Sequence, residues 1–459
     1  MSDLRDLRDE VVALARDLIR IDTSNAPEAL LGHRPGRETA VAEHLHAYLS
    51  EAGVECELVA REDDRANLVA RIPGAGQAPS LAFVGHTDVV PVDPRDWTHP
   101  PFEGVVDDDG YLWGRGAIDM KGEVAARAVA MAELARSGFR PAGDLWLLAV
   151  ADEEDGMAGV GMRWLLQERS DIRPDLAVNE GGGQWLPLRD GRTVVTVGVG
   201  EKGTYPVVVS AVGEAGHASM PSVGDNAVPL LGDLLRRVGR GMPDPEPSPL
   251  LLRMLEVLVP DAVASLSGAT EDDLTDAVAA AAALHPGLED LLPALTGTTM
   301  APTVLAASTK RNVMPARASV ELDCRILPGT TAADVEAAVR RRLGNGIAYE
   351  LSWPEPLIAG SASSPDSVLM AAIAECVAAS GVEDADAALL PVLDTGFTDS
   401  VYLREAAGTT AYGFSPYRFT PPEVIAAGYH NADERVHVDD LALSARMHVD
   451  LARRLLSGG

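Results

Sequence analysis

The sequence has few cysteines, and they lie far apart. Cys56, Cys324 and Cys376 are the only three in 459 residues. An odd number of widely spaced cysteines excludes both a CxxC metal site and a disulfide framework, and it fits a reducing compartment. We therefore expect a cytoplasmic protein.

Long apolar runs are also missing. No stretch approaches the ~20 apolar residues that a membrane-spanning helix needs. Within residues 1–21, apolar residues recur at helical spacing between charged ones, which predicts an amphipathic helix rather than an export signal. These absences predict that the protein has no membrane partner.

Basic residues are scarce beside acidic ones. The chain has 69 Asp and Glu residues against 38 Lys and Arg residues, which gives a formal net charge of -31 at pH 7. Such a surface repels nucleic-acid phosphates and anionic lipids, so we expect neither as a partner. Solubility is the simplest explanation of the charge, with a salty habitat or a basic partner as alternatives.

The length of the chain exceeds that of one ordinary domain, so two domains are expected. Within 1–199, buried-strand patterns alternate with helical patterns, which indicates an α/β domain with a mainly parallel sheet. Half-buried strand patterns and a long helical stretch follow. They predict a smaller inserted domain at 200–352, with a helical insertion at about 245–295. The first domain then resumes over 353–459.

Polar residues stand where several of the predicted strands end. The clearest case is the stretch 81–122, in which an apolar run ends in the triplet HTD and a glycine-rich turn follows. In sheets of this kind, ligands bind beyond the carboxyl ends of the strands, so we expect these side chains to meet. The polar residues at strand ends and turns are His86, Asp88, Asp119, Glu153, Glu154 and Glu180.

Together with a late histidine, this set has the composition of a two-metal site. Two imidazoles and three carboxylates suit a pair of zinc-like ions ~3.5–4 Å apart, bridged by a carboxylate and a water. The candidate ligands are His86, Asp119, Glu154, Glu180 and His430. Taken singly, each of these residues is more simply a structural or surface residue, and their joint placement is what favours the metal site.

Two further carboxylates fit supporting roles at such a site. Asp88 is close enough in sequence to accept the second N–H of His86, which would fix the orientation of the ring. Glu153 adjoins the proposed ligand Glu154, and neighbouring residues at a strand end point in different directions. Glu153 is therefore placed to take a proton from the attacking water and pass it to a leaving amine. Its alternative role is that of a surface acid.

The motifs of the chain resemble those of the M20 family of metallopeptidases. That family includes acetylornithine deacetylase, succinyl-diaminopimelate desuccinylase, aminoacylase and glutamate carboxypeptidase. In chain order the motifs are HTDVVP, WTHPPFEG, GRGAIDMKG, the DEED cluster, NEGGG, GEKG, GHASMP, RNVMPA, DCRILPG and GYHNADERV. The resemblance covers nearly the whole chain. It implies an α/β catalytic domain of the zinc-peptidase type, with a mainly parallel sheet, interrupted by a smaller α+β lid domain.

The resemblance also implies how the ligands are shared. His86 and Glu180 would bind one ion, Glu154 and His430 the other, and Asp119 would bridge them. The expected cofactors are two divalent metal ions, Zn²⁺ first, with Co²⁺ or Mn²⁺ as alternatives. By the same resemblance, Glu153 would be the general base, and Asp88 would orient His86.

Four residues outside the metal set resemble residues that meet the substrate. His217, in GHASMP, would reach the site when the lid closes, often from a partner subunit, and stabilise the oxyanion of the tetrahedral intermediate. Asn312 and Arg325 resemble residues that hold the substrate carboxylate, which a guanidinium binds through two parallel hydrogen bonds. Gly396, in DTGFTDS, resembles a glycine whose backbone approaches the substrate. The alternatives are a helix-capping histidine at His217 and an ordinary strand ion pair at Arg325.

The sequence thus predicts a hydrolase that cleaves the amide bond of an N-acyl amino acid or a short peptide with a free carboxylate. The attacking group would be metal-activated water, with Glu153 as general base. A dipeptidase or aminopeptidase is an alternative, and it would need a site for the substrate's ammonium group. A catalytically silent binding protein is a further alternative, against which the intact ligand set speaks. The helical insertion leaves open whether a homodimer forms through the lid domain.

Overall fold

The computed structural model describes residues 4–26, 28, 36–156, 158–243, 245–263, 271–384 and 386–458. Parts of the predicted loop 22–36 and of the helical insertion, and residue 157 of a predicted helix, lie outside these ranges. The chain divides into two compact units. The first unit comprises Met1–Val199, Ser363–Val392 and Thr398–Gly459, and the second comprises Gly200–Ala362 and Leu393–Phe397.

The second unit begins at Gly200 and ends at Ala362, ten residues beyond the expected end at 352. The reason is a short strand, β17 (Ser361–Ala362), which pairs with Gly200 and Glu201 and so stays with the second unit. A five-residue return, Leu393–Phe397, also belongs to this unit, and nothing in the local sequence pattern indicates it.

The first unit is built around a sheet in the order β1-β2-β6-β3-β7-β19-β9. The four central strands pair in parallel, and the pairings toward both edges are antiparallel. This mixed α/β sheet with a parallel centre confirms the predicted fold class. The strands are β1 (Glu55–Ala60), β2 (Ala66–Ile72), β3 (Leu81–His86), β6 (Leu145–Val150), β7 (Leu176–Asn179), β8 (Trp185–Pro187), β9 (Thr193–Glu201), β18 (Ala388–Asp394) and β19 (Thr410–Gly413).

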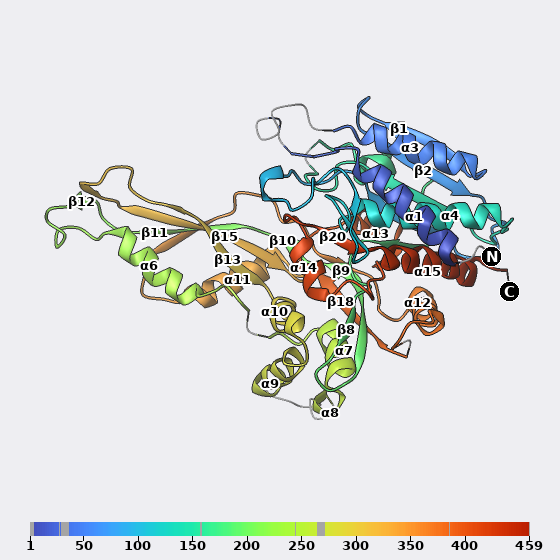
Figure 1. Cartoon of the computed structure of the whole chain (residues 1–459). Helices are drawn as coiled ribbons and strands as arrows, with labels where there is room; N and C mark the ends of the chain where they lie inside the picture. Colours follow the sequence, from blue (N-terminus) through green and yellow to red (C-terminus); the bar gives the residue numbers. More distant parts are fainter. Residues whose placement is uncertain are drawn as a thin grey trace. The chain divides into compact units, whose positions relative to one another are not determined.

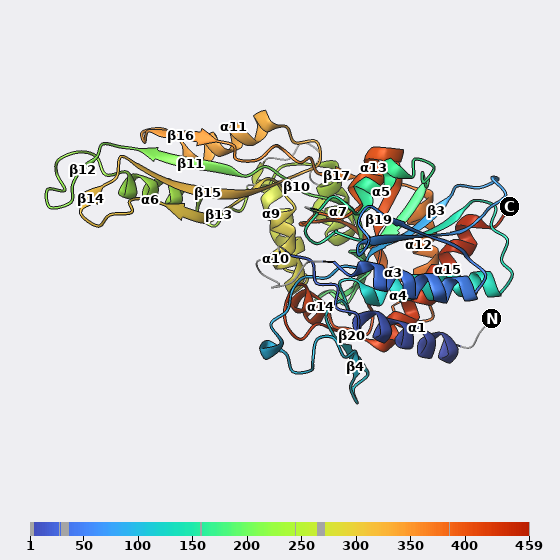
Figure 2. The same ribbon diagram turned by 90° about the horizontal axis from the view of Figure 1, so that it is seen from above.

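Helices cover both faces of this sheet, as Figure 2 shows. Helices α1, α3, α4 and α15 lie on one face, with α12 against α15, and α5 and α13 lie on the other. Helix α4 is apolar on nearly every side because it is enclosed between the sheet, α1 and α15. The helices are α1 (Leu4–Ile19), α3 (Glu38–Glu51), α4 (Lys121–Arg136), α5 (Met162–Glu168), α12 (Val368–Ala379), α13 (Ser400–Ala407), α14 (Pro422–Gly428) and α15 (Val438–Leu456).

A small sheet in the order β20-β5-β4 joins the last part of the first unit to an earlier loop. Its register pairs Arg435 with Trp113 and Val436 with Leu112, so the segment after His430 lies beside the segment before Asp119. Its strands are β4 (Val105–Val106), β5 (Tyr111–Trp113) and β20 (Arg435–His437), and a 3₁₀ turn, η1 (Pro94–Asp96), precedes them.

The second unit contains a five-stranded antiparallel sheet with helices on one face (Figure 1). Apolar residues of α6 and α11 pack on the sheet and form one continuous core. The predicted helical insertion folds as a group of helices that contact one another. The elements are β10 (Gly203–Thr204), β11 (Val207–Val212), β12 (Gly216–His217), α6 (Ala227–Val238), α7 (Pro249–Leu258), α8 (Pro260–Val263), α9 (Glu271–Ala282), α10 (Pro286–Ala294), β13 (Thr299–Ala306), β14 (Val313–Met314), β15 (Arg317–Ile326), α11 (Ala332–Leu343) and β16 (Tyr349–Ser352).

Among the helices of the described ranges, none combines the length and the apolar character that crossing a bilayer requires.

Candidate metal centre

The parallel centre of the sheet brings the functional side chains to one edge. In β3, His86 is level with Val150 at the end of β6, and Phe83 is level with Val178 in β7. The turns that follow β6 and β7 carry Glu154 and Glu180 and therefore begin beside His86. This is the edge at which open α/β sheets bind ligands.

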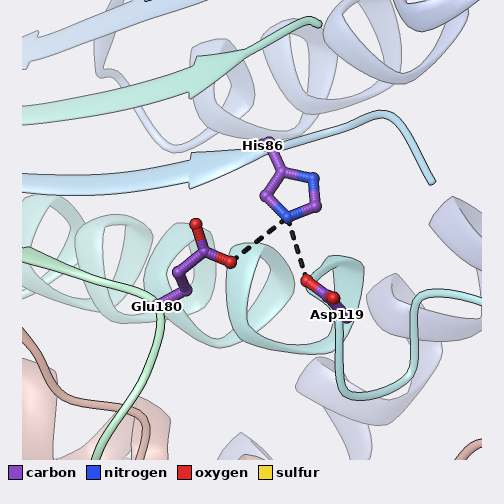
Figure 3. Close-up of side chains that lie close together, drawn as sticks. All are labelled: His86, Asp119 and Glu180. Carbon is purple, nitrogen blue, oxygen red and sulfur yellow. Dashed lines mark hydrogen bonds and ion pairs between the residues drawn. The ribbon is translucent and has the colours of Figure 1, made fainter. Parts of the chain in front are cut away.

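The first group of possible ligands consists of His86, Asp119 and Glu180 (Figure 3). The Nε2 atom of His86 lies 3.0 Å from Oδ1 of Asp119 and 3.4 Å from Oε2 of Glu180. The His86 side chain is only 1% exposed. In Figure 3 the carboxylates of Asp119 and Glu180 both face the same ring nitrogen of His86. Two carboxylates arranged in this way can interact with one positive charge placed between them.

The second group consists of Asp119, Glu154 and His430. The Nε2 atom of His430 lies 3.2 Å from Oδ2 of Asp119 and 3.0 Å from Oε2 of Glu154. Asp119 thus turns one carboxylate oxygen to each histidine. The structure brings together all five residues that the sequence proposed as ligands, with Asp119 between the other two pairs.

Two buried oxygen atoms test whether these groups fit metal ions. No described residue hydrogen-bonds Oε1 of Glu154 or Oε1 of Glu180. A buried carboxylate oxygen without a partner is costly unless a cation or a proton meets it. Carboxylate oxygens and imidazole nitrogens are also the donors that zinc and similar divalent ions take. The residues present therefore fit a pair of divalent ions.

The two histidines feel the surrounding negative charge strongly. Burial alone would lower the pKa of His86, but the carboxylates of Glu180, Asp119 and Asp88 outweigh it and hold that pKa well above its usual value. Hydrogen bonds to Asp119 and Glu154 raise the pKa of His430 to about 10. Without a metal ion, protons on these rings offset the carboxylates, so a metal ion must displace them.

The pKa values of the adjacent glutamates are raised as well, which disfavours the charged form of these carboxyl groups. Burial, with the charge of Asp119 next in importance, raises the pKa of Glu154 to about 7 although His430 opposes the shift. Burial followed by the charge of Glu180 raises the pKa of Glu153 well above its usual value. Asp399, at the start of α13, adds to this effect on Glu153. Glu153 is half-buried beside the ligands and is a better proton acceptor than an ordinary glutamate.

Asp88 supports the centre differently from the sequence expectation. The Nδ1 atom of His86 lies 3.0 Å from the backbone carbonyl oxygen of Asp88 and 3.5 Å from its carboxylate oxygen Oδ1, so the carbonyl is the nearer acceptor. The carboxylate accepts the backbone N–H groups of Glu153 at 3.2 Å and Glu154 at 3.1 Å. It also accepts the Asn25 amide at 2.8 Å. Asp88 thus joins the His86 loop to the turn that carries Glu153 and Glu154.

Left-handed backbone occurs at two positions of the centre. Asp152, immediately before Glu153, has φ of 63°, and the ligand His430 has φ of 55°. Residues other than glycine rarely adopt this region, and they do so where the surrounding structure over-determines it. The Asp152 carboxylate accepts the N–H of Gly159 at 2.8 Å and the Asn25 amide at 3.2 Å, which holds the turn closed.

A buried arginine lies behind the centre, and the sequence analysis missed it. The Arg127 guanidinium donates to the carbonyl of Val84 in β3 and, at 2.8 Å, to the carbonyl of Asn179 in β7. Glu123, one helical turn earlier, lies 3.7 Å from it. Arg127 therefore ties the two strands that carry His86 and Glu180. A single charged residue inside the apolar stretch 124–132 was the signal available in the sequence.

Two of the four predicted substrate residues lie on a small ribbon of the second unit. Strands β12 and β14 pair His217 with Val313, and the carbonyl of Asn312 accepts the N–H of Ala218 at 3.2 Å. The His217 ring is exposed, and its Nδ1 lies 2.7 Å from the Ser219 hydroxyl. His217 therefore does not cap a helix, and its Nε2 makes no hydrogen bond to a described residue.

Arg325 and Gly396 also belong to the second unit. Arg325 forms a two-pronged ion pair with Asp323 two residues earlier in β15, at 2.8 and 3.2 Å. This is the strand ion pair that the sequence left as the alternative, and both side chains are 40% exposed. Gly396 is exposed, and a Cβ atom there would meet no described atom within 4 Å.

Comparison with known proteins identifies the family. Residues 82–454 match the profile of peptidase family M20/M25/M40. The chain belongs to this family. The match confirms the recognition made from the motifs and the class of metallopeptidase-type enzymes to which we assigned the chain.

Curated relatives share a name. The succinyl-diaminopimelate desuccinylase of Paracoccus denitrificans is 30% identical over 417 residues, covering 89% of this chain and 90% of the relative. A probable succinyl-diaminopimelate desuccinylase of Staphylococcus epidermidis is 37% identical over 230 residues, and this match spans only half the length of either chain.

Solved structures of the family share the fold. An M20 metallo-carboxypeptidase from Sulfolobus solfataricus superposes with a TM-score of 0.65 at 17% identity, over 97% of this chain and 99% of that one. The Bacillus subtilis YXEP protein, described as a dinuclear metal binding peptidase, gives a TM-score of 0.59 at 15% identity, over 98% of this chain and 99% of that one. At these identities the likeness establishes the fold alone.

Proposed function

We propose that the protein hydrolyses the amide bond of an N-acyl amino acid, or of a short peptide with a free carboxylate, at a two-metal centre. His86 and Glu180 would hold one ion, and Glu154 and His430 the other. The observation that carries the proposal is the position of Asp119, whose two oxygens lie 3.0 and 3.2 Å from different histidines. Divalent ions bound there supply an activated water and polarise the amide carbonyl.

Glu153 is the proposed general base. Its raised pKa suits a group that must take a proton from the attacking water and release it to the departing amine. The hydrogen bond from its N–H to Asp88 fixes the start of its side chain relative to the His86 loop.

The lid residues complete the proposal. His217 would donate to the developing oxyanion through its Nε2, because the other ring nitrogen, Nδ1, already lies 2.7 Å from the Ser219 hydroxyl. Asn312 and Arg325 would bind the substrate carboxylate. To do so, Arg325 would give up its exposed ion pair with Asp323 and form one with the substrate. An exposed ion pair contributes only about 0–1 kcal/mol, so this exchange costs little. Gly396 would let the backbone approach the substrate.

An N-succinyl amino acid is the first substrate class to test. The relatives that align along nearly their whole length, from Paracoccus denitrificans and Rhodospirillum centenum, are both named succinyl-diaminopimelate desuccinylase. A succinyl group would bring a second carboxylate, for which the basic residues of the second unit are candidates.

One observation favours the alternative, a dipeptidase. Asp399 is 4% exposed, and burial followed by the charge of Glu180 raises the pKa of its carboxyl well above its usual value. The hydroxyl of its neighbour Ser400 accepts the amide of Asn179 at 3.2 Å, which places the start of α13 beside the turn that carries Glu180. A buried carboxyl group that other carboxylates surround is the group that a substrate ammonium would need.

The deciding experiment is amine release from a matched panel of N-succinyl, N-acetyl and other N-acyl amino acids and of dipeptides, with Zn²⁺, Co²⁺ or Mn²⁺. We expect turnover of N-acyl amino acids and a loss of about 10²–10⁴-fold in kcat for Glu153→Ala. The control is Asp155→Asn, which removes an exposed carboxylate from the same turn and should leave the rate unchanged. Turnover that survives both metal removal and Glu153→Ala would refute the mechanism, and turnover of dipeptides alone would favour the alternative.

The native ions, the oligomer and the location complete the proposal. We propose Zn²⁺, with Co²⁺ or Mn²⁺ as alternatives, and metal analysis of protein purified without added metal decides among them. A homodimer through the second unit is supported by the edge strand β13, whose Val304 and Leu305 are 56% and 65% exposed. Sedimentation of the native chain and of Leu305→Lys tests it. A cytoplasmic location stays a prediction from the cysteine pattern.

A further inference from the structure

One buried carboxylate lies between two of the loops that present proposed ligands. Glu434 is 0% exposed. Its Oε1 accepts the backbone N–H of Ile118 at 2.7 Å and that of Asp119 at 2.9 Å. Its Oε2 accepts the N–H of Gly116 at 3.0 Å and a guanidinium N–H of Arg115 at 2.6 Å. All four donors belong to the turn that carries Asp119.

Glu434 is also part of the loop that carries the proposed ligand His430. It stands four positions after His430 in the chain. Its own carbonyl accepts the N–H of Gly114 at 3.0 Å, and a second guanidinium N–H of Arg115 reaches the carbonyl of Asn431 at 3.1 Å. The Asp119 turn and the His430 loop are therefore joined through both backbone and side chain.

The two ligand groups depend on this junction to different degrees. In the first group, His86 ends a strand and Glu180 follows the last residue of another, so the sheet places both. In the second group, all three residues lie in turns, and the His430 side chain is 58% exposed. Two of those three, Asp119 and His430, belong to the segments that Glu434 joins.

We propose that Glu434 is a positioning residue for the second metal ion, the one that Asp119, Glu154 and His430 would bind. The inference rests on the proposed two-metal centre. Glu434 touches neither ion nor substrate. It acts by holding the Asp119 backbone and the His430 loop at a fixed separation before the ion binds, so that the ion meets its ligands without ordering two turns.

The substitution Glu434→Gln isolates this role because it keeps the size of the side chain. Each carboxylate oxygen accepts two donors, so an amide must turn its NH₂ group toward two other N–H groups whichever way it is placed. Glu434→Asp keeps both acceptor oxygens but draws them back by one C–C bond, about 1.5 Å. Arg115→Met removes only the guanidinium that reaches both segments.

Asp440 offers a matched control. It is also 0% exposed, and its carboxylate accepts the backbone N–H groups of Arg418, Phe419 and Thr420 at 2.7, 2.8 and 2.7 Å. Those donors belong to a turn with no proposed ligand. Asp440→Asn therefore disturbs a comparable junction away from the metal centre and should lower stability without changing metal affinity.

The experiment titrates the metal-free full-length protein with Zn²⁺ alone by calorimetry, and with Co²⁺ alone by its visible absorption. Wild type should bind two ions. In Glu434→Gln one binding step should weaken by about 10–100-fold while the other changes by less than about threefold. Glu434→Asp and Arg115→Met should weaken the same step by smaller factors, and the Co²⁺ band of that step alone should shift.

His430→Ala identifies the affected step, because it removes a ligand of the second ion only. Adding Glu434→Gln to His430→Ala should have no further effect on the remaining step. Equal weakening of both steps, unchanged binding in Glu434→Gln, or the same selective loss in Asp440→Asn would overturn the proposal. If the wild-type protein binds two ions and turns over substrate while Glu434→Gln binds both ions with unchanged affinity, only the inference about Glu434 is refuted. If the wild-type protein binds no metal ion, the proposed function is refuted as well.

Discussion

The metal centre of the first unit and the β12–β14 ribbon of the second unit hold their functional side chains in contrasting ways. His86 is 1% exposed, and its neighbours Asp88 and Arg127 are fully buried and hydrogen-bonded to several segments of the chain. On the ribbon, His217 and Asn312 are exposed, and their hydrogen bonds join them to the neighbouring residues Ser219 and Ala218.

The difference indicates what each region can do. Buried groups that hydrogen-bond across distant segments are fixed by the fold, so the geometry of the centre exists before substrate or metal binds. A two-stranded ribbon with few buried contacts changes its conformation at little free-energy cost. Under the proposed function we therefore expect the centre to supply precise placement and the ribbon to supply a group that can adapt to the substrate.

The largest effect is expected at the residue that both ligand groups share. Asp119→Asn keeps the shape of the side chain but removes the charge that both ions would use. Since such ions contribute several kcal/mol to transition-state stabilisation, the rate should fall by about 10³-fold or more. Metal analysis should find less than one ion per chain, and a variant that retains two ions would contradict the shared-ligand assignment.

A second test compares a buried arginine with an exposed one. Arg127→Met leaves the buried Glu123 without its partner and should lower the free energy of unfolding by about 3–5 kcal/mol. Arg325→Met breaks the exposed pair with Asp323 and should change it by at most about 1 kcal/mol. Chemical denaturation of the metal-free proteins measures both values. Similar losses for the two variants would remove the contrast between the regions.

The third test asks whether the ribbon takes part in catalysis. His217→Ala removes an exposed side chain, so stability should change by less than about 0.5 kcal/mol. If the ring donates to the oxyanion, kcat should fall by about 10²–10³-fold. Ser219→Ala, which removes the hydroxyl beside the ring, should have a smaller effect. Full activity in His217→Ala would exclude the ribbon from the reaction.

The smallest expected effect is the dependence of metal affinity on pH. In the metal-free protein the pKa of His430 is about 10 and that of Glu154 is about 7, so below about pH 7 both groups hold protons that a metal ion must displace. Between about pH 7 and about pH 10 only His430 holds a proton that the metal ion must displace. Affinity for the second ion should therefore rise with pH, by about tenfold per pH unit for each displaced proton. Competition with a chelator from about pH 6 to pH 9 measures it, and a flat profile would contradict the role of His430.

The sequence predicted the elements whose signal is local. Apolar patterns predict a helix at 121–137, a strand at 81–84 and a helix at 439–456, and the observed α4, β3 and α15 lie within two residues of these bounds. Strand β19, Thr410–Gly413, was not predicted. Its four residues carry no periodic signal, and it forms a strand because it pairs with β7 on one side and β9 on the other.

The same distinction applies to the centre. The five proposed ligands were recognisable because their motifs are local and follow apolar runs. Glu434 lies inside a motif that the sequence analysis quoted, yet its role was missed, since its hydrogen-bond donors Arg115 and Asp119 are more than 300 residues away in the chain. The contribution of the Asp88 carbonyl to His86 is likewise a matter of loop geometry.

By itself the sequence determined the class of chemistry: the kinds of ligand, their order, and their positions after apolar strands. These depend on residue type and on short-range pattern. Only the tertiary structure decided that each oxygen of Asp119 faces a different histidine, that Asp88 holds the Glu153 turn, and that the Asp119 and His430 segments are joined at Glu434. Those contacts link residues far apart in the chain, and their distances follow from the packing of the whole unit.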